Sequence, residues 1–395
     1  MKYDFDKINN RRNTNSMKWD VPDNELPMWV ADMDFQTAPE VIEALKDRVE
    51  QGIFGYNIVP EAWYEAIQGW WGRRHHLEIE KEWLIFCTGV IPAVTCAVKR
   101  LTNVGDKVLI QTPVYDIFFH SVENQGRHVL ESPLVYDGHT YAMDYQDLEE
   151  KLSDPLTTMM ILCNPHNPVG KIWSKEELAK IGELCKRYHV VVLSDEIHCD
   201  LTEPGYDYVS YASASQTCRD NSVICISASK AFNFAGLQTA AVVAASEELR
   251  EKMKRGLNSD EVAEPNTFAT GAVIAAFTKG QEWLEELRAY ISGNRQLVKS
   301  FLEQELPQIR LVESRATYLL WVDCRTITDD TGQLCTCLRQ ETGLYLTAGG
   351  QYRGDGRYFI RINIACPKSQ VQKALTLLKQ GIQKHLSTQQ RVTAP

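Results

Sequence analysis

Residues 226–238 read "ISASKAFNFAGLQ" and directly follow the apolar run "SVIC" at residues 222–225. Unbroken apolarity of this kind predicts a strand that is buried on both faces. The strand ends on small residues and Lys230, although most lysines of soluble proteins are solvated surface charges. In open α/β sheets, ligands bind outside the carboxyl ends of the strands. The stretch therefore predicts a core strand that presents a lysine to a ligand site.

Five more apolar runs have the same character, with no in-out alternation along any of them. They are "WLIFC" (83–87), "KVLIQ" (107–111), "TMMILC" (158–163), "HVVVLS" (189–194) and "TAAVVAA" (239–245). Amphipathic helical patterns lie between them. One of these opens with Ser174 and Glu177, the arrangement of a capping box. Strands that are covered on both faces and separated by helices predict an α/β fold with a mostly parallel sheet.

The last third of the chain has a different organisation. A long helical pattern covers Gln281–Leu306, and the apolar runs 317–323 and 357–365 predict strands before a final amphipathic helix. This organisation predicts an N-terminal segment that packs with the small domain, a large α/β domain and a small α+β domain. Their predicted limits are residues 1–45, 46–285 and 286–395.

The composition of the chain limits which partners and which cellular compartment are expected. The chain has 395 residues, a formal net charge of -10 and a sequence pI near 5.5. This acidic balance argues against nucleic acid or an anionic membrane as a partner. The eleven cysteines are scattered without metal-ligand spacing, which predicts reduced thiols and no metal site. The polar N-terminus and the lack of a long apolar run predict neither a signal peptide nor a membrane span, so we expect a cytoplasmic protein.

Residues that can bind a ligand follow five of the predicted strands, at the edge where a ligand site is expected. After residues 83–87, Gly89 and Pro92 suit the start of a helix, whose free N–H groups can bind phosphate. The other strand ends supply an aromatic ring, two amides, a carboxylate, two hydroxyls and an amine. These come from Tyr115, Asn164, Asn167, Asp195, Ser227, Ser229 and Lys230.

Each of these residues alone fits an ordinary role in a cap, a turn or the core. Together they fit one ligand with a phosphate group, an aromatic face, a ring nitrogen that needs a carboxylate and an aldehyde that needs a lysine. Pyridoxal phosphate has all of these features, and its recognised protein partners are a lysine and a carboxylate at the pyridinium nitrogen. The glycine-rich nucleotide motifs and the paired-histidine zinc motif are absent from the sequence. We therefore predict a pyridoxal-phosphate site.

Four stretches of the chain resemble fold type I pyridoxal-phosphate enzymes. They are "PMWVADMDF", "NPHNPVG", "DEIHCDL" and "SASKAFNFAGLQ". More narrowly, they are similar to the branch of cystathionine β-lyases and cysteine desulfhydrases that includes the MalY and PatB proteins. The resemblance extends from "NTNSMKWD" to "IRINIACP", nearly the whole chain. It implies the PLP-dependent transferase-like fold, with a large domain and a smaller α+β domain.

The resemblance also implies a role for each matching residue. Lys230 would bond to the cofactor aldehyde, Asp195 would pair with the pyridine nitrogen, and Asn167 would hydrogen-bond the ring hydroxyl. Tyr115 would stack on the ring. Arg361 would bind the substrate α-carboxylate, a task that suits the guanidinium fork. The hydroxyls and N–H groups that would hold the phosphate belong to Ser227, Ser229, Val90 and Ile91.

Four further positions either match the residues of these enzymes or depart from them. Tyr56, in "FGYN", would act in catalysis and reach the phosphate of the neighbouring subunit, which implies a homodimer with shared active sites. His198 stands where many aminotransferases have a tyrosine near the ring hydroxyl, and both a cofactor contact and a structural role stay open. Gln238 replaces the phosphate-binding arginine of common aminotransferases, as is usual in the lyase branch. Ala316 stands where relatives often have glycine, which leaves the shape of the substrate pocket open.

We therefore expect a carbon–sulfur β-lyase that cleaves cystathionine or related cysteine S-conjugates to a thiol (homocysteine from cystathionine), pyruvate and ammonia. An aminotransferase is the nearest alternative, because it would share every cofactor residue. A regulatory binding protein that kept the fold and lost turnover is the third alternative. The presence of Lys230, Asp195 and Arg361 disfavours it.

Overall fold

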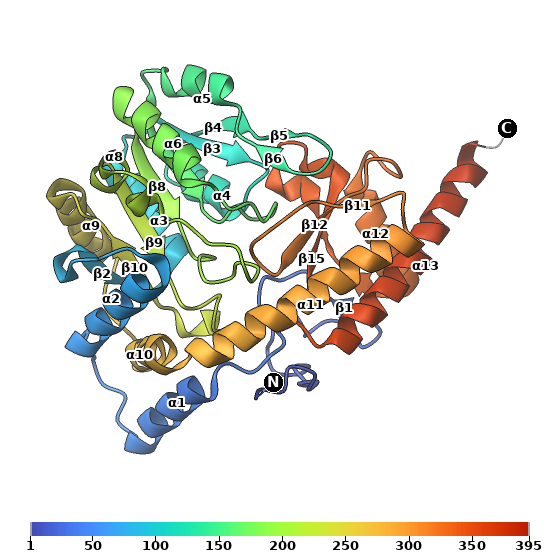
Figure 1. Ribbon diagram of the computed structural model, residues 1–395, viewed down its shortest axis with the longest axis horizontal. Coiled ribbons are helices and arrows are strands. Elements are labelled where there is room, and N and C mark those ends of the chain that lie inside the picture. The colour runs from blue at the N-terminus through green and yellow to red at the C-terminus, as the bar shows by residue number, and fades with distance from the viewer. Residues whose placement is uncertain (1, 394–395) are drawn as a thin grey trace.

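A seven-stranded sheet forms the centre of the larger unit of the molecule (Figure 1). The structure, a computed structural model, describes residues 2–393, and side chains as far as residue 387. The strands lie in the order β2-β10-β9-β8-β7-β3-β4, and in this sheet β10 alone runs antiparallel to its neighbours. The predicted mostly parallel sheet is thus confirmed. The strands are β2 (Leu84–Cys87), β3 (Lys107–Thr112), β4 (His128–Pro133), β7 (Thr157–Cys163), β8 (Val191–Asp195), β9 (Ser222–Ile226) and β10 (Ala240–Val243).

Successive side chains along these strands alternate between two covered faces. Val108 and Ile161 pack in one core, while Leu109 and Met160 belong to the core on the opposite face. Because neither face meets solvent, the strands are apolar along nearly their whole length, which explains the unbroken runs in the sequence. The helices of the first core are α3 (Val90–Leu101), α4 (Ile117–Glu123) and α9 (Glu247–Ser259), and those of the second include α2 (Glu61–His75), α6 (Lys175–Arg187) and α10 (Ala269–Lys279).

The predicted capping box at the start of α6 is confirmed. The Glu177 N–H donates to Ser174 Oγ at 3.1 Å, and the Ser174 N–H donates to Glu177 Oε2 at 2.7 Å. The reciprocal pair satisfies two N–H groups that the first turn of a helix otherwise leaves without partners.

A four-stranded antiparallel sheet forms the second unit, in the order β11-β12-β15-β14. The helix α11 (Gln281–Glu305) runs from the large unit to this one (Figure 1). The predicted boundary between residues 285 and 286 falls inside α11, and the domain limits remain a prediction. The elements are β11 (Arg310–Leu311), β12 (Leu319–Asp323), β14 (Thr347–Ala348), β15 (Phe359–Asn363), α12 (Thr331–Thr342) and α13 (Lys368–Thr393).

The N-terminal segment touches both units. Its strand β1 (Leu26–Pro27) pairs in parallel with β13 (Leu344–Tyr345) of the second unit. Its helix α1 (Pro39–Gln51) packs against α10 of the large unit. The remaining elements are α5 (Tyr145–Leu152), α7 (Tyr211–Ala214), α8 (Gln216–Asp220), β5 (Val135–Tyr136), β6 (Tyr141–Ala142) and the 3₁₀ turns η1 (Lys81–Trp83), η2 (Ala235–Leu237), η3 (Gly349–Tyr352) and η4 (Gly356–Tyr358). Across residues 2–393, no helix has the length and hydrophobicity needed to cross a membrane.

Candidate active site

Lys230 lies in the turn after β9, at the carboxyl edge of the large sheet. Its amine donates a hydrogen bond to the Ala31 carbonyl, with Nζ and O 2.7 Å apart. Burial lowers the pKa of this amine to about 8, against the opposing effect of the Asp32 carboxylate and with a further lowering by Arg361. A lysine with so low a pKa has a substantial neutral fraction near neutral pH, and the neutral amine is the nucleophile and base.

Asp195 is the last residue of β8 and is buried at the same edge. Burial raises the pKa of its carboxyl to about 7, although the Ile197 N–H, which donates to Oδ1 at 3.0 Å, lowers it. The nearby Glu196 raises the pKa further, and the Lys230 ammonium lowers it. A buried carboxylate of this kind is stabilised by a cationic partner, such as a protonated ring nitrogen.

Arg361 enters the site from β15 of the second unit. Its Nη1 donates to Asn167 Oδ1 at 3.4 Å and its Nη2 donates to the Trp29 carbonyl at 2.9 Å. Its guanidinium lies over the ring of Tyr352, 5.0 Å from the centroid. Its Nε–H is buried and has no hydrogen-bond partner among the described residues. The guanidinium is therefore held in place with donor capacity left, as binding of an anion requires.

Tyr115 and His198 lie among these groups. The Tyr115 N–H donates to the Asn167 carbonyl at 3.1 Å, and burial raises the pKa of the phenol to about 12. His198 is buried, and burial together with Lys230 and Arg361 lowers its pKa to about 3, so the ring is neutral. Its Nδ1 has no hydrogen-bond partner within the described chain. This ring nitrogen is therefore available to bind a ligand. The contact of His198 with the cofactor stays a prediction.

The residues expected to hold a phosphate lie at one end of three neighbouring strands. Ala240, at the start of β10, pairs with Cys87 at the end of β2, and the next residue, Ala241, pairs with Ile226 at the end of β9. The α3 N-terminus therefore begins close to the turn that carries the two serines. The residues of this cradle are Gly89, Val90, Ile91, Ser227 and Ser229, and the two serine Oγ atoms are 2.9 Å apart.

Tyr56 is separate from this group. It lies between α1 and α2, and its side chain is fully exposed at 103 % of the reference area, so it contacts none of the site residues of its own chain. Ala316, by contrast, is buried, and its N–H donates to the Gly170 carbonyl at 3.1 Å. Gly170 has a φ of 68°, and a side chain there would also meet the Ala316 carbonyl, so this turn requires glycine at 170.

Some residues near Lys230 and Asp195 were missed by the sequence analysis. Tyr318 donates its hydroxyl to the Ala31 carbonyl at 3.0 Å, beside Lys230. Glu196 is buried and accepts hydrogen bonds from Ser194, Tyr208, Ser210 and the Tyr211 N–H. Only the adjacent "DE" pair at 195–196 hinted at Glu196, and no sequence signal marked the carbonyl of Ala31.

The arrangement fits pyridoxal phosphate. Lys230 could bond to its aldehyde, Asp195 could pair with its ring nitrogen, and the N–H and hydroxyl groups of the cradle could bind its phosphate. The unused buried nitrogens of His198 and Arg361 are the polar atoms that a bound cofactor and an anionic substrate could satisfy.

Comparisons with known proteins agree with this assignment. The family model "Aminotransferase class I and II" matches residues 25–378. The chain is 40% identical over 384 residues to the cystathionine β-lyase PatB of Bacillus subtilis, covering 96% of this chain and 99% of that protein. It is 31% identical to the protein MalY of Escherichia coli, with 96% and 99% covered. Its structure matches cystalysin from Treponema denticola, which contains pyridoxal 5'-phosphate, with a TM-score of 0.94, 32% identity, and 97% of this chain and 100% of that chain covered.

Proposed function

The chain belongs to the aminotransferase class I and II family, and we propose that it is a carbon–sulfur β-lyase that uses pyridoxal phosphate. The observation that supports this most directly is a buried lysine of lowered pKa at one sheet edge with the Asp195 carboxylate and the Arg361 guanidinium. The relatives indicate the reaction class, since PatB is a cystathionine β-lyase. Its substrates are cystathionine or related cysteine S-conjugates.

The residues divide the work of an elimination. Arg361 binds the α-carboxylate of the substrate and so sets the direction of the bonds at Cα. The cofactor, when bound, supplies a protonated ring that withdraws electrons from Cα. Asp195 keeps that ring nitrogen protonated. The neutral Lys230 amine accepts the Cα proton, and the thiolate leaves from Cβ with its electron pair. Addition of water to the remaining product yields pyruvate and ammonia.

An aminotransferase would use the same binding residues and differ in the fate of the Cα electrons. The similarity to PatB over nearly the whole chain favours elimination. The first test is product analysis. Cystathionine and a panel of S-substituted cysteines should give pyruvate, ammonia and thiol in equal amounts. Pairing the same amino acids with a series of 2-oxo acids should give little amino-group transfer. Transfer that outpaces pyruvate formation would establish the aminotransferase instead, and binding without either product would establish a regulatory protein.

We also propose a homodimer with shared sites. Tyr56 sits in an exposed apolar loop together with Ile53, Phe54 and Ile58, which are 56–81% exposed. Monomeric proteins rarely leave several large apolar side chains exposed together, and such patches mark interfaces. In a twofold dimer the loop of each subunit would contact the active site of the other subunit, so Tyr56 would reach the phosphate bound there. The cytoplasm is the proposed compartment, and the eleven cysteines, all free, fit its reducing conditions.

Subunit mixing tests the shared site. Lys230→Ala and Tyr56→Phe are each expected to be severely impaired, because they remove the amine and the hydroxyl from different parts of the site. In a mixed dimer one site carries both defects and the other carries neither. Co-expression with two affinity tags, followed by purification of the heterodimer, should therefore return up to about half of the wild-type activity per dimer. If Tyr56→Phe is impaired and verified heterodimers stay inactive, Tyr56 acts within its own chain.

A further inference from the structure

The segment Trp29–Phe35, here called the strap, has no helix or strand, yet side chains hold it along its whole length. Each of its carbonyls accepts a hydrogen bond from at least one side chain. Backbone carbonyls without regular structure usually meet solvent or turn partners, so this degree of side-chain binding indicates a backbone that must keep one conformation. The side chains that bind it are those of Asn9, Arg11, Lys18, Lys230, Asn233, Tyr318, Thr347, Arg361 and Asn363.

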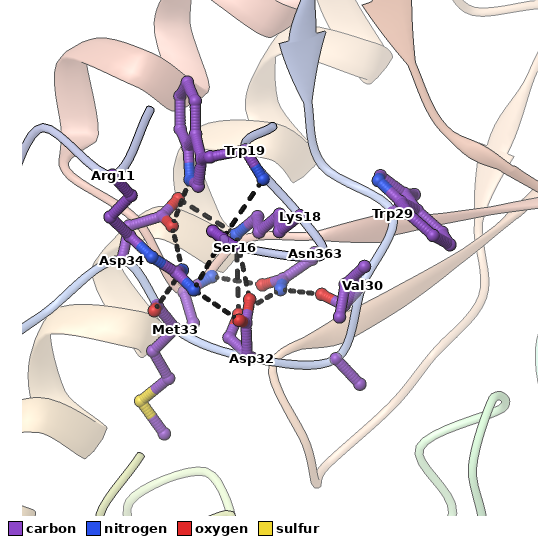
Figure 2. A network of polar contacts seen from close by, with 12 residues as sticks. Arg11, Ser16, Lys18, Trp19, Trp29, Val30, Asp32, Met33, Asp34 and Asn363 are labelled. Atoms are coloured by element: carbon purple, nitrogen blue, oxygen red, sulfur yellow. Dashed lines mark hydrogen bonds and ion pairs between the residues drawn. The ribbon is translucent and has the colours of Figure 1, made fainter. Parts of the chain in front are cut away.

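A buried charge cluster anchors one end of the strap (Figure 2). Lys18 and Asp34 are 1% and 3% exposed and form an ion pair at 2.9 Å. Arg11 bridges both acidic residues of the strap, at 2.8 Å from Asp34 and 2.6 Å from Asp32, and the Trp19 indole donates to Asp34 at 2.7 Å. Two cations and two anions balance one another, so the cluster fixes the strap without leaving an uncompensated buried charge.

Asn363, the last residue of β15, holds the middle of the strap. Its side-chain Nδ2 donates to the carbonyls of Val30 and Asp32, each at 2.6 Å (Figure 2). Its Oδ1 accepts the Ala365 N–H at 2.8 Å, which fixes the orientation of the amide. The two carbonyls on either side of Ala31 therefore point to Asn363, and the Ala31 carbonyl points to Lys230 Nζ instead.

We propose that Asn363 is a positioning residue for the catalytic lysine. By holding the carbonyls of Val30 and Asp32, it directs the Ala31 carbonyl at the Lys230 amine whenever that amine is free of the cofactor. A carbonyl only accepts hydrogen bonds, so it binds an N–H of the amine and leaves the nitrogen lone pair available for the substrate Cα proton. The second donor to the same carbonyl, the Tyr318 hydroxyl, uses its other lone pair. The catalytic part of this inference rests on the proposed function.

The groups that face Lys230 come from several elements, and an uncharged substitution at residue 363 neither adds nor removes a charge among them. They are Asp32 of the strap, Asp195 at the end of β8, His198 after β8, Arg361 of β15 and Tyr318 before β12. A shift in the titration of Lys230 in such a variant therefore reports a change in the hydrogen bond of the amine or in its distance from these groups, including Asp32 of the strap. The shift cannot come from a charge introduced or removed at residue 363, because both side chains at that position are uncharged.

The test compares Asn363→Leu with a matched variant, Asn294→Leu. Asn294 is also buried, and its Nδ2 also donates to two carbonyls, those of Ile364 and Cys366, at 3.0 and 2.9 Å. Asn363→Leu loses the three described hydrogen bonds of its amide and Asn294→Leu loses two, so both variants should lower the melting temperature. Only Asn363→Leu frees the strap beside Lys230. Asn363→Ser, whose hydroxyl can donate to one carbonyl at most, is the milder second variant if the leucine variant does not fold.

The first readout is the titration of Lys230 in cofactor-free protein. An amine-reactive label is applied over a range of pH, and the extent of modification at residue 230 is measured by peptide mass spectrometry. The wild-type midpoint should lie near the lowered pKa of about 8. The Asn363 variants should lower it by about half a pH unit or more, because loss of the acceptor removes stabilisation of the ammonium. Asn294→Leu should leave it in place. This readout needs no turnover, so it stands apart from the proposed reaction.

The second readout is the elimination itself. In the Asn363 variants kcat should fall roughly 10- to 100-fold with a smaller change in KM, since a displaced amine is badly placed for the proton. The isotope effect with Cα-deuterated substrate should rise, because proton removal becomes slower relative to the other steps. An unchanged or raised midpoint, or equal effects of the Asn363 and Asn294 variants, overturns the proposal. Failure of the proposed function would instead appear in the wild type, as lack of pyruvate formation.

Discussion

Lys230→Ala is expected to lower C–S β-lyase activity by at least about 10⁴-fold, because one amine both anchors the cofactor and accepts the Cα proton. Burial lowers the pKa of this amine to about 8. The variant should fold as the wild type does, since within the described residues the Lys230 side chain makes a single hydrogen bond, to the Ala31 carbonyl. The measurement is the rate of pyruvate formation from cystathionine at saturating cofactor, compared between the wild type and the variant.

Reduction with borohydride gives a second measurement on the same lysine. It should fix pyridoxal phosphate to the wild-type peptide that contains Lys230, and it should fix none in Lys230→Ala. Lys252→Ala is the matched control, because Lys252 lies on the surface of α9 and, among the residues the structure describes, forms an ion pair with Glu248 alone, an exposed i,i+4 contact. That variant should keep wild-type activity and labelling. Recovery of the reduced cofactor on a different lysine would contradict the assignment of Lys230.

The positions of the residues that follow the sheet strands could be predicted, because the carboxyl ends of parallel strands all lie at the same edge of the sheet. Any residue directly after such a strand lies at the carboxyl edge, whatever the details of the intervening helices. Tyr115, Asn167, Asp195 and Lys230 lie at or just after the carboxyl ends of the neighbouring strands β3, β7, β8 and β9, so short-range patterns alone place them together. The apolar runs that carried this prediction are long enough to identify strands and are buried on both faces.

The strap could not be predicted in the same way. Its apolar residues recur with a period of neither 2 nor 3.6, and most of its partners lie far away in the chain, as with the hydrogen bond between Asn363 and Val30. Sequence patterns report local periodicity, whereas irregular backbone is fixed by individual side chains from distant segments. The resemblance did identify "PMWVADMDF", but only as a motif, without a role for the Ala31 carbonyl. Arg361 was identified through the resemblance, while Asn363 in the same strand was not.

The roles of the individual site residues remain predictions. Substitution of Asp195 best separates a role in catalysis from a role in stabilising the fold. Asp195→Asn should slow elimination by roughly 10²-fold or more, because an amide cannot balance the charge on a protonated ring nitrogen. The substitution keeps the size of the side chain and the acceptor for the Ile197 N–H, so the fold should persist. Cofactor should still bind, through Lys230 and the phosphate cradle, and its absorbance should report a ring that protonates less readily.

The pH dependence follows from the pKa of the Asp195 carboxyl, which burial raises to about 7. Above this pH the wild-type carboxyl is ionised and can pair with the ring nitrogen. Below it the carboxyl is neutral and resembles the asparagine side chain. The advantage of wild type over Asp195→Asn in cofactor affinity should therefore be largest above pH 7 and shrink as the pH falls below it. Equilibrium binding of pyridoxal phosphate to both apoproteins across this range measures the difference.

Glu196→Gln is the matched control for Asp195→Asn, because both residues are buried carboxylic acids in adjacent positions. Glu196 accepts hydrogen bonds from Tyr208, Ser210 and the Tyr211 N–H and so ties the loop after β8 to α7. Its loss should lower the melting temperature more than activity, whereas the loss of Asp195 should do the reverse. If Asp195→Asn kept near-normal turnover with cofactor bound, the carboxylate would only cap the turn at Ile197. The ring nitrogen would then need no anionic partner in this enzyme.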